Sequence, residues 1–432
     1  MTPLAIGLIG MVVLIVLMLV RVPVAVAIGL TGYLGYAAID GWDKASSLMG
    51  TVPLELSAAY SLSVFPLFVL MGALVTSAGL SKDLFQAANG LFRGTRGSLG
   101  MAALLASALF SAVCGSSLAT AATMSRVSIP EMIHAGYSPR LAAGVVAAGG
   151  TLGILIPPSL ILMIYAIIAQ QSVAKLFAAA LLPGVLLTVL YMAVVVVVVR
   201  LQPAPAAVSP PTPAAPRGTA GRLWPIGALF IVTLGGIYGG IFTPTEAAAV
   251  GAFGSLVIAA FTRRLSWRKI GPVFMETVRN VAGLLFIVMA SMLFSYFVVQ
   301  TGISQAVIEV VGRSSVSPVE VIVAVCAVYV LLGCILEGIG MILITVPIVL
   351  PLVTSFGWDP VWFGVLLVVL VEIGLIHPPL GMNIFIIRAT VRDLDTKTIS
   401  LGIIPFLAAP FILLCLMIAW PELALWLPGQ MR

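Results

Sequence analysis

The stretch AAGGTLGILIPPS, residues 147–159, returns in altered form 221 residues later in the same chain. Its counterpart lies in EIGLIHPPLGMNIF, residues 372–385. Both are apolar runs interrupted by glycine and by a pair of prolines, and a proline inside a helix removes a backbone hydrogen bond. The two stretches therefore predict a helix that breaks at the same place in two related halves. The residues that agree are Gly153 with Gly374, Pro157 with Pro378 and Pro158 with Pro379.

The same offset relates further points along the chain. It carries AGYSPR, residues 135–140, onto FGWDPV, residues 356–361. Membrane helices draw on a small alphabet, so single Gly and Pro matches can be coincidences, but these local patterns are rare. We interpret the chain as an internal repeat. Its predicted parts are a first half at residues 1–201, a Pro/Ala-rich linker at 202–222 and a second half at 223–432.

The composition places both halves in a membrane. Of 432 residues, 61% are hydrophobic and 8% are charged, and the mean hydropathy is +1.21. A bilayer core takes roughly 20 apolar residues per helix, and such stretches recur along the whole chain. The sequence predicts an all-α polytopic membrane protein. The formal charge of +6 comes from scattered residues, so we expect contact with membrane lipids and no nucleic acid as a partner.

Loop charges indicate that the repeat is inverted. The loop at residues 40–55 has one basic residue, Lys44, whereas its counterpart after residue 261 is rich in them. Basic loops stay in the cytoplasm, so equivalent loops lie on opposite sides of the membrane. Followed along the chain, this rule predicts periplasmic amino and carboxyl termini and a cytoplasmic linker. The basic residues of the second loop are Arg263, Arg264, Arg268, Lys269 and Arg279.

Two inverted halves are typical of a secondary carrier, because they give inward-open and outward-open states of similar energy around one central site. Other classes lack their signatures in this sequence. It contains no Walker A pattern, no TVGYG filter, and no Ser/His, HExxH or paired-Asp arrangement at membrane depth. We therefore expect a transporter and not an enzyme.

Glycine, proline and small polar residues interrupt two further apolar segments, at residues 115–132 and 336–351. Each precedes one of the proline-pair stretches, at matching places in the two halves. Such interruptions free backbone carbonyls and amides at membrane depth, where they need partners. Carbonyls and Ser/Thr hydroxyls suit Na⁺, and the amino termini of half-helices suit a carboxylate.

These segments resemble the signatures of large permease (M) subunits of TRAP (tripartite ATP-independent periplasmic) transporters, the DctM-like members of the ion transporter superfamily. The likeness covers nearly the whole chain. It implies a bacterial inner-membrane protein with a scaffold and a transport domain that moves as an elevator, and with a re-entrant helical hairpin and a broken helix in each repeat. The segments that carry it are GSSLATAATMSRVSIPEM (115–132), GYSPRLAAGVVAAGGTLGILIPPS (136–159), GGIFTPTEAAAVGA (239–252) and EIGLIHPPLGMNIF (372–385).

The resemblance also implies partners and a coupling ion. A small permease subunit of four helices, expected as a separate chain, and a soluble periplasmic substrate-binding protein would complete the system. The activity would be Na⁺-coupled symport of a small carboxylate or dicarboxylate. Two alternatives stay open: a stand-alone Na⁺- or H⁺-driven carboxylate carrier, and an anion channel or purely structural membrane subunit.

Two Na⁺ sites are expected where the hairpins meet the broken helices. The structural alternative is that small residues let membrane helices pack closely without binding an ion. The candidate residues are Ser117, Thr120, Gly150, Thr151 and Gly153 for the first site, and Gly338, Gly340, Thr345, Gly374, Pro378 and Gly381 for the second.

Arg126 is the strongest single candidate for holding the substrate. A guanidinium can bind a carboxylate with two hydrogen bonds, and an unpaired cation in a membrane segment is costly. The alternatives are an ion pair with Glu131 and a helix-end arginine that reaches the interface. His377 stands where the family resemblance leads us to expect Thr or Ser. The other substrate candidates are Ser116, Ser117, Pro157, Pro158, His377 and Asn383.

Three acids lie in apolar or Gly/Pro-rich stretches: Glu246, Glu337 and Glu372. A proton relay needs linked carboxylates, and these three are far apart in the sequence. Hydrogen bonds that tie helices together are therefore their expected role.

Overall fold

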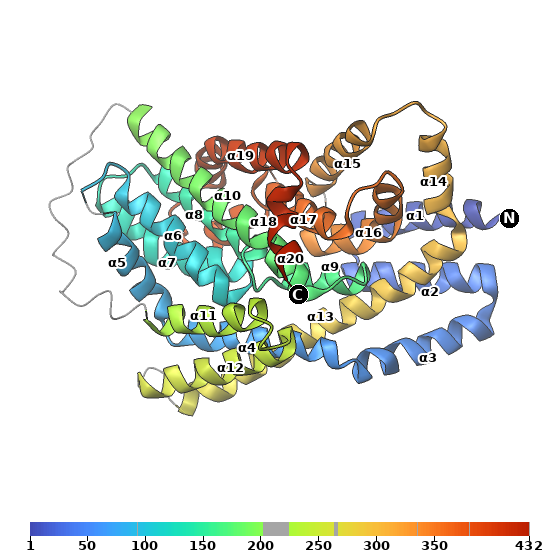
Figure 1. The fold of residues 1–432 in the computed structure, drawn as a ribbon, viewed down its shortest axis with the longest axis horizontal. Helices are drawn as coiled ribbons and strands as arrows, with labels where there is room; N and C mark the ends of the chain where they lie inside the picture. The colour runs from blue at the N-terminus through green and yellow to red at the C-terminus, as the bar shows by residue number, and fades with distance from the viewer. Residues whose placement is uncertain (93, 202–223, 263–266, 335, 380, 432) are drawn as a thin grey trace.

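The structure is a computed structural model that describes residues 1–432 apart from 93, 202–223, 263–266, 335, 380 and 432. The predicted linker at 202–222 lies outside the described residues. Within them every regular element is a helix, which confirms the all-α prediction. Helices from both halves of the sequence interleave in one body (Figure 1).

The first half of the chain supplies the hairpin and broken helix that contain the first set of candidate residues. Its helices are α1 (Pro3–Leu19), α2 (Val24–Asp40), α3 (Trp42–Ala58), the 3₁₀ helix η1 (Tyr60–Ser63), α4 (Val64–Ser77), α5 (Leu80–Leu91), α6 (Ser98–Cys114), α7 (Ser117–His134), α8 (Pro139–Leu155), α9 (Leu160–Ile168) and α10 (Val173–Leu201).

The second half follows the same order, except that the single helix α13 takes the place of α3, η1 and α4, and α17 begins and ends 221 residues after α8. Its helices are α11 (Trp224–Tyr238), α12 (Pro244–Phe261), α13 (Trp267–Thr301), α14 (Ile303–Gly312), α15 (Pro318–Gly333), α16 (Gly338–Ser355), α17 (Pro360–Ile376), α18 (Met382–Thr390), α19 (Thr396–Ala419) and α20 (Glu422–Gln430).

The patterns AGYSPR and FGWDPV end one helix and begin the next. Gly136 and Gly357 have φ of +85° and +87°, a left-handed conformation that favours glycine, just after α7 and α16. Ser138 and Asp359 then cap α8 and α17. The Ser138 hydroxyl accepts one backbone N–H at 3.2 Å, and the Asp359 carboxylate accepts two at 2.7 and 3.0 Å. A proline takes the first turn in both helices, where its missing N–H costs nothing.

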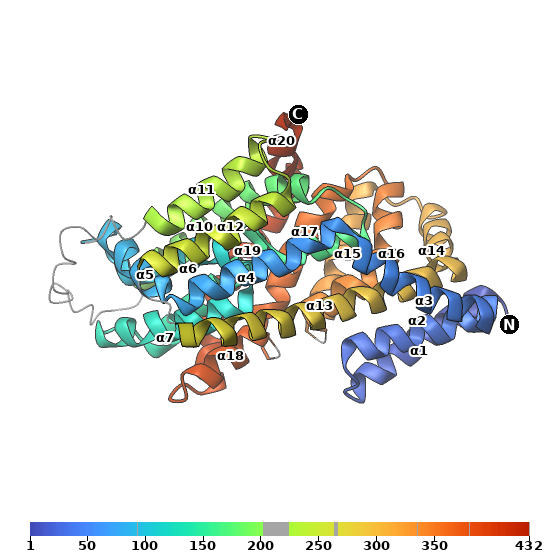
Figure 2. The same cartoon turned by 90° about the horizontal axis from the view of Figure 1, so that it is seen from below.

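The helices of the two halves pack crosswise. α2 packs along α13, and its counterpart α12 packs along α4. In the same way, α8 packs against α19 while α17 packs against α10. Figure 2 shows α4 and α13, one from each half, running side by side along the molecule. These contacts between the halves thus occur in pairs with the roles exchanged, as an inverted repeat requires.

Two hairpins and two broken helices form the centre. α6 and α7 make the first hairpin and α15 and α16 the second, while α8–α9 and α17–α18 are helices interrupted by short breaks. α7 packs against α18, and α16 packs against α9. Each hairpin therefore meets the second segment of the other half's broken helix, and the central region is built from both repeats.

Several helices are long and apolar enough to cross a membrane, which supports the predicted multi-pass membrane protein. The outer faces are apolar as well: on α1, residues such as Leu8, Val12 and Leu19 are exposed. The seven candidate spans among the described residues are Tyr60–Ser77, Pro139–Ile168, Val173–Leu201, Pro244–Phe261, Ile270–Thr301, Gly338–Ser355 and Thr396–Ala419.

Candidate functional site

The tip of the first hairpin lies against the break of the first broken helix. Gly115 ends α6 with φ +64°, and a Cβ there would stand 2.6 Å from the Pro158 carbonyl oxygen. The Leu160 N–H at the start of α9 points at the Gly115 carbonyl oxygen, 3.4 Å away. Only glycine fits this contact without displacing the loop at residues 156–159, so the tip and the break form one unit.

The break itself is held by Ser159. Its hydroxyl donates to the Ile154 carbonyl at 2.5 Å and accepts the Leu162 N–H at 3.2 Å, so one side chain ends α8 and caps α9. Pro157 and Pro158, two predicted substrate residues, occupy the loop between these two helices. The loop is buried beside the hairpin tip.

Asn383 joins the two repeats at this point. It lies on α18, is fully buried, and donates from Nδ2 to the Ala147 carbonyl of α8 at 3.0 Å. Its Oδ1 accepts the Ser117 hydroxyl at 3.1 Å, at the start of α7. Gly150 makes room for it, since a Cβ on Gly150 would lie 3.0 Å from the Asn383 amide nitrogen. One side chain of the second half thus links the hairpin and the broken helix of the first.

Further small residues complete the first predicted Na⁺ site. The hydroxyls of Thr120 and Ser111 lie 3.3 Å apart and are buried. A Cβ on Gly153 would lie 2.8 Å from the Ser116 backbone, so these two candidates are in contact. The Ser116 hydroxyl accepts the Ala119 N–H at 3.4 Å as the cap of α7.

Thr151 is the member of this set that faces elsewhere. Its hydroxyl donates to the Ala148 carbonyl at 2.8 Å and lies 3.1 Å from the Tyr191 hydroxyl of α10. Ser111 and Tyr191 were missed by the sequence reasoning. Their partners lie nearby only in the folded chain, and no spacing along the sequence indicates that α6 and α10 take part.

At the second hairpin a helix of the hairpin again lies close to the broken helix, but fewer side-chain oxygens are present there. Gly374 of α17 and Gly333 of α15 touch, since a Cβ on either would lie 3.0 Å from the other's Cα. Thr345 donates to the Met341 carbonyl at 2.6 Å and accepts the hydroxyl of Tyr329, which the sequence reasoning also missed, at 2.5 Å. Gly338 faces Val371, and Gly340 faces Val24. The described contacts of the second set are therefore mostly apolar.

The break between α17 and α18 holds the remaining candidates. The Gly381 N–H donates to the His377 carbonyl at 3.0 Å, which turns the chain through Pro378 into α18. His377 is half-buried, and its Nδ1 is buried without a hydrogen-bond partner among the described residues. The first turns of α16 and α18 have no side-chain cap, and in α18 the Ile384 N–H donates to the Gly381 carbonyl at 3.0 Å.

Arg126 stands apart from the hairpin tip. It lies nine residues beyond Ser117 on α7, roughly 14 Å along the helix axis. Its side chain is exposed, and within the described part of the chain it makes no ion pair with Glu131. The structure therefore removes the ion-pair alternative, and the substrate role of Arg126 stays a prediction.

The expected helix-tying role of the three acids is wrong for Glu372, because neither of its buried carboxyl oxygens has a hydrogen-bond partner in the described structure. Glu246 is exposed and closes a capping box, in which it accepts the Thr243 N–H at 2.8 Å. Glu337 precedes α16 and makes no side-chain cap. Each acid thus has a separate environment.

The oxygens gathered at the first hairpin suit a small monovalent cation. Ser117, Thr120, Ser111 and Asn383 offer neutral side-chain oxygens beside the backbone carbonyls of a helix end. No group of three or more His, Cys, Asp or Glu side chains among the described residues is placed to hold a metal ion, so the donors here differ from a transition-metal set.

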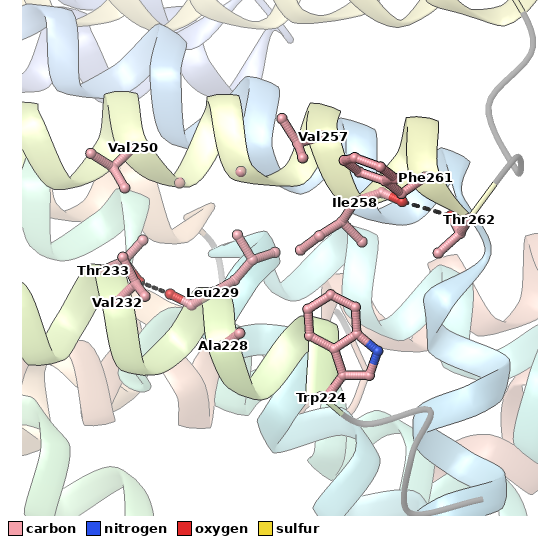
Figure 3. A pocket seen from close by; sticks show the side chains of 12 residues that line it. Trp224, Ala228, Leu229, Val232, Thr233, Val250, Val257, Ile258, Phe261 and Thr262 are labelled. Atoms are coloured by element: carbon pink, nitrogen blue, oxygen red, sulfur yellow. Dashed lines mark hydrogen bonds between the residues drawn. The ribbon is translucent and has the colours of Figure 1, made fainter.

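A cavity between α11 and α12 is a poor match for an anionic substrate. It has a volume of about 470 Å³ and is lined by apolar side chains such as Trp224, Ile258 and Phe261. Figure 3 shows its two hydroxyls, on Thr233 and Thr262, bonded to carbonyls of their own helices. The cavity holds none of the predicted site residues.

A family model described as the tripartite ATP-independent periplasmic transporter, DctM component, matches residues 11–423. The chain belongs to this family. Among curated relatives, it is 36% identical to the C4-dicarboxylate TRAP transporter large permease protein DctM of Pseudomonas aeruginosa, over 87% of this chain and 88% of that one. It is 31% identical to the sialic acid TRAP transporter large permease protein SiaM of Vibrio cholerae, over 85% and 86%.

The fold of this TRAP large permease is shared with a solved transporter. The YdaH transporter of Alcanivorax borkumensis matches with a TM-score of 0.63 over 89% of each chain. The sequences are 15% identical, so the likeness concerns the fold alone. It is a helical membrane-transporter fold, in agreement with the fold class expected from the repeat.

Proposed function

We propose that this TRAP permease subunit carries a small carboxylate across the bacterial inner membrane by Na⁺-coupled symport. The observation that carries the proposal is Asn383, whose amide binds a first-repeat carbonyl and a hairpin hydroxyl at once. An ion bound among these oxygens contacts α7, α8 and α18 together. Its binding therefore favours one arrangement of three helices that come from both repeats.

The chemistry of the donors supports Na⁺. The hydroxyl of Ser117, the amide oxygen of Asn383 and backbone carbonyls are hard, neutral ligands that replace the hydration shell of a small cation. Neutral donors leave the bound ion with its positive charge. That charge attracts a carboxylate to the same region, and by linkage the carboxylate strengthens Na⁺ binding equally. This reciprocity couples the two solutes.

The substrate class follows from the anion-binding groups and from the relatives. The amino termini of α16 and α18, which have no side-chain cap, carry partial positive charge, and Arg126 carries a full one on the exposed face of α7. The curated relatives are named for C4-dicarboxylates and for sialic acid, both of which are carboxylates. We propose a small carboxylate or dicarboxylate for this chain.

Movement is proposed to occur between an inner and an outer group of helices. The inner group contains the hairpins and broken helices, and the outer group contains α1–α4 and α11–α13. The inner group moves as an elevator against the outer scaffold. The termini, following the loop charges, lie in the periplasm.

Two partners complete the proposal. The family description names a tripartite, periplasmic system, which supports a small permease subunit and a periplasmic substrate-binding protein as the other components. Delivery by the binding protein distinguishes this function from the second candidate, a stand-alone carrier of the same superfamily.

Counterflow in proteoliposomes tests the carrier mechanism. Vesicles that contain this chain and its small subunit are loaded with unlabelled dicarboxylate, and labelled dicarboxylate is added outside with the binding protein and Na⁺. A symporter accumulates label transiently and saturates with substrate, whereas a channel shows neither behaviour. Replacing Na⁺ by K⁺ on both sides abolishes the accumulation if Na⁺ is the coupling ion. Accumulation that persists in K⁺ overturns the Na⁺ assignment.

A further inference from the structure

Two short helices connect the outer and inner groups along the chain. α5 joins α4 to the first hairpin, and α14 joins α13 to the second hairpin. Each follows a glycine in the left-handed conformation, Gly79 with φ +67° and Gly302 with φ +68°. The sequences GLS at residues 79–81 and GIS at residues 302–304 therefore occupy equivalent places in the two repeats. Any movement of the inner group has to be accommodated at these two connections.

The two connecting helices are docked differently on their hairpins. α14 packs chiefly against α16, the second helix of its hairpin, and the Ser304 hydroxyl donates to the Pro347 carbonyl at 3.1 Å. α5 packs chiefly against α6, the first helix of its hairpin. No hydrogen bond joins the hydroxyl of Ser81, the counterpart of Ser304, to α7 in the part of the chain that the structure describes. The two repeats thus differ at this one connection.

The Pro347 carbonyl needs a partner from outside its own helix. A helical carbonyl accepts the N–H four residues further on, but Pro351 has no N–H to donate. The buried hydroxyl of Ser304 takes that place. α7 has the same feature, because its Pro130 leaves the Arg126 carbonyl without a helical donor. These two positions are the counterparts of Pro351 and Pro347 at the 221-residue offset.

The difference between the repeats indicates how the hairpins move. In a carrier with inverted repeats, each repeat adopts the conformation of the other when the central site changes sides. The exchange moves α5 from its place on α6 toward α7, and it moves α14 away from α16. The Ser81 hydroxyl then reaches the Arg126 carbonyl, while Ser304 leaves Pro347. A carbonyl without a donor is costly at membrane depth, so each such contact stabilises the arrangement in which it forms.

We propose that Ser81 and Ser304 are positioning residues that latch the inner group alternately in its two arrangements. Ser304 holds the second hairpin in the arrangement that the structure shows, and Ser81 holds the first hairpin in the opposite one. Each latch is a hydrogen bond from a serine hydroxyl to a carbonyl that a proline has left without a donor. The two latches rest on the elevator movement of the proposed function.

The rate of disulfide formation reports the arrangement without any transport. A Cβ on Gly340 of α16 would lie 4.0 Å from the Val24 Cβ of α2, a spacing that suits a disulfide, so Val24→Cys with Gly340→Cys joins the inner and outer groups in the arrangement shown. The four native cysteines are replaced by alanine. Ser304→Ala lowers the initial rate about fivefold, and Ser81→Ala raises it. Ser57→Ala, on exposed α3, is the control and leaves the rate unchanged.

The opposite signs distinguish two latches from a general loss of packing. Rates that are equal in the Ser304→Ala, Ser81→Ala and control proteins overturn the proposal. A shift in the same direction for both serines overturns it as well.

The proline of α16 provides a second test. Pro351→Ala restores the N–H that the Pro347 carbonyl lacks, so this carbonyl no longer depends on the Ser304 hydroxyl. Ser304→Ala then has no further effect on the rate of disulfide formation, because the two substitutions act on the same carbonyl. A further fivefold fall in the Pro351→Ala protein overturns the latch.

Failure of the latch and failure of the proposed function give different results. Counterflow of dicarboxylate by the wild-type protein tests symport by itself. Counterflow in a protein whose disulfide rate responds to neither serine overturns the latch alone. Disulfide rates that shift as expected in a chain without counterflow support the latch and count against the symport proposal.

Discussion

At the scale of single residues, substitution of Asn383 tests the proposed Na⁺ site. Its amide makes two buried hydrogen bonds between repeats, at 3.0 and 3.1 Å. Asn383→Ala removes both and leaves the Ala147 carbonyl without its partner, a loss of about 2 kcal/mol. We expect the Na⁺ concentration for half-maximal uptake to rise about tenfold or more. Ser57→Ala, on exposed α3, is the control and leaves Na⁺ dependence unchanged. An unaltered Na⁺ dependence in Asn383→Ala contradicts the site.

Substitutions of Arg126 test whether this residue binds the carboxylate of the substrate. Arg126→Ala should lower dicarboxylate uptake about tenfold or more, because a charge-assisted, bidentate contact is lost. Arg126→Lys keeps the charge without the planar fork and should recover only part of the uptake. Arg313→Ala, another exposed arginine, is the matched control. Equal uptake by the wild-type and Arg126→Ala proteins would show that the carboxylate is held elsewhere.

The sequence allowed prediction of candidate residues inside the interrupted segments, but not of their partners elsewhere in the chain. Ser117, Gly150, Gly153 and Asn383 are predicted from the sequence because they lie in interrupted, apolar segments. The structure brings them together, and their binding roles stay predictions. Tyr191 was missed because it lies in α10, whose sequence is an ordinary apolar run. Its importance arises from a contact with Thr151, 40 residues away. A sequence pattern that covers only a few residues gives no sign of a partner this far along the chain.

The contact between α15 and α17 supplies a test at the scale of elements. Gly374→Ala places a Cβ 3.0 Å from the Gly333 Cα, which forces the two helices apart at a cost of about 1–3 kcal/mol. The melting temperature in detergent should fall. Gly283→Ala on α13 meets nothing within 4 Å and should leave the protein as stable or more so. A Gly374→Ala protein as stable as the control would mean that the close approach is not tight.

The cap at the start of α19 should make the stability of the protein depend on pH. The hydroxyl and the backbone N–H of Thr398 both hydrogen-bond to the Asp395 carboxylate. These bonds favour its charged form and hold the pKa of that carboxyl below its usual value. A lowered folded-state pKa stabilises the protein above the unfolded-state pKa, and this stability disappears as pH falls through the folded value. Asp395→Ala should therefore lower the melting temperature at neutral pH and have a smaller effect at acidic pH, below the usual aspartate pKa of about 3.9. Equal destabilisation at both pH values contradicts the cap.

The residues that end and begin helices made several helix bounds predictable from the sequence. Gly136 and Gly357 stop helices, and the Ser-Pro and Asp-Pro pairs that follow start the next ones, so the offset of 221 residues gives the bounds of α8 and α17. The packing of α7 against α18 was not predictable from these signals. Turn chemistry acts over a few residues, whereas that contact joins segments in different halves of the chain.

At the scale of the whole molecule, the crosswise packing is what the proposed coupling requires, because an ion bound at one hairpin would touch helices of both repeats. Each hairpin rests on the second segment of the other repeat's broken helix, so a change at one tip reaches both halves. Composition and the repeat were enough to predict this all-α membrane architecture, because hydropathy and a fixed offset are properties of the sequence as a whole. Orientation in the membrane rests on loop charge and stays a prediction.

Uptake by the complete system tests symport that depends on both Na⁺ and the binding protein. This chain and its small subunit are placed in proteoliposomes, and uptake of labelled dicarboxylate is measured with and without an inward Na⁺ gradient, and with and without the binding protein. We expect uptake only when the Na⁺ gradient and the binding protein are both present, and we expect Asn383→Ala to abolish it. Uptake that proceeds equally well without the binding protein would identify a stand-alone carrier, and uptake without Na⁺ would contradict the coupling.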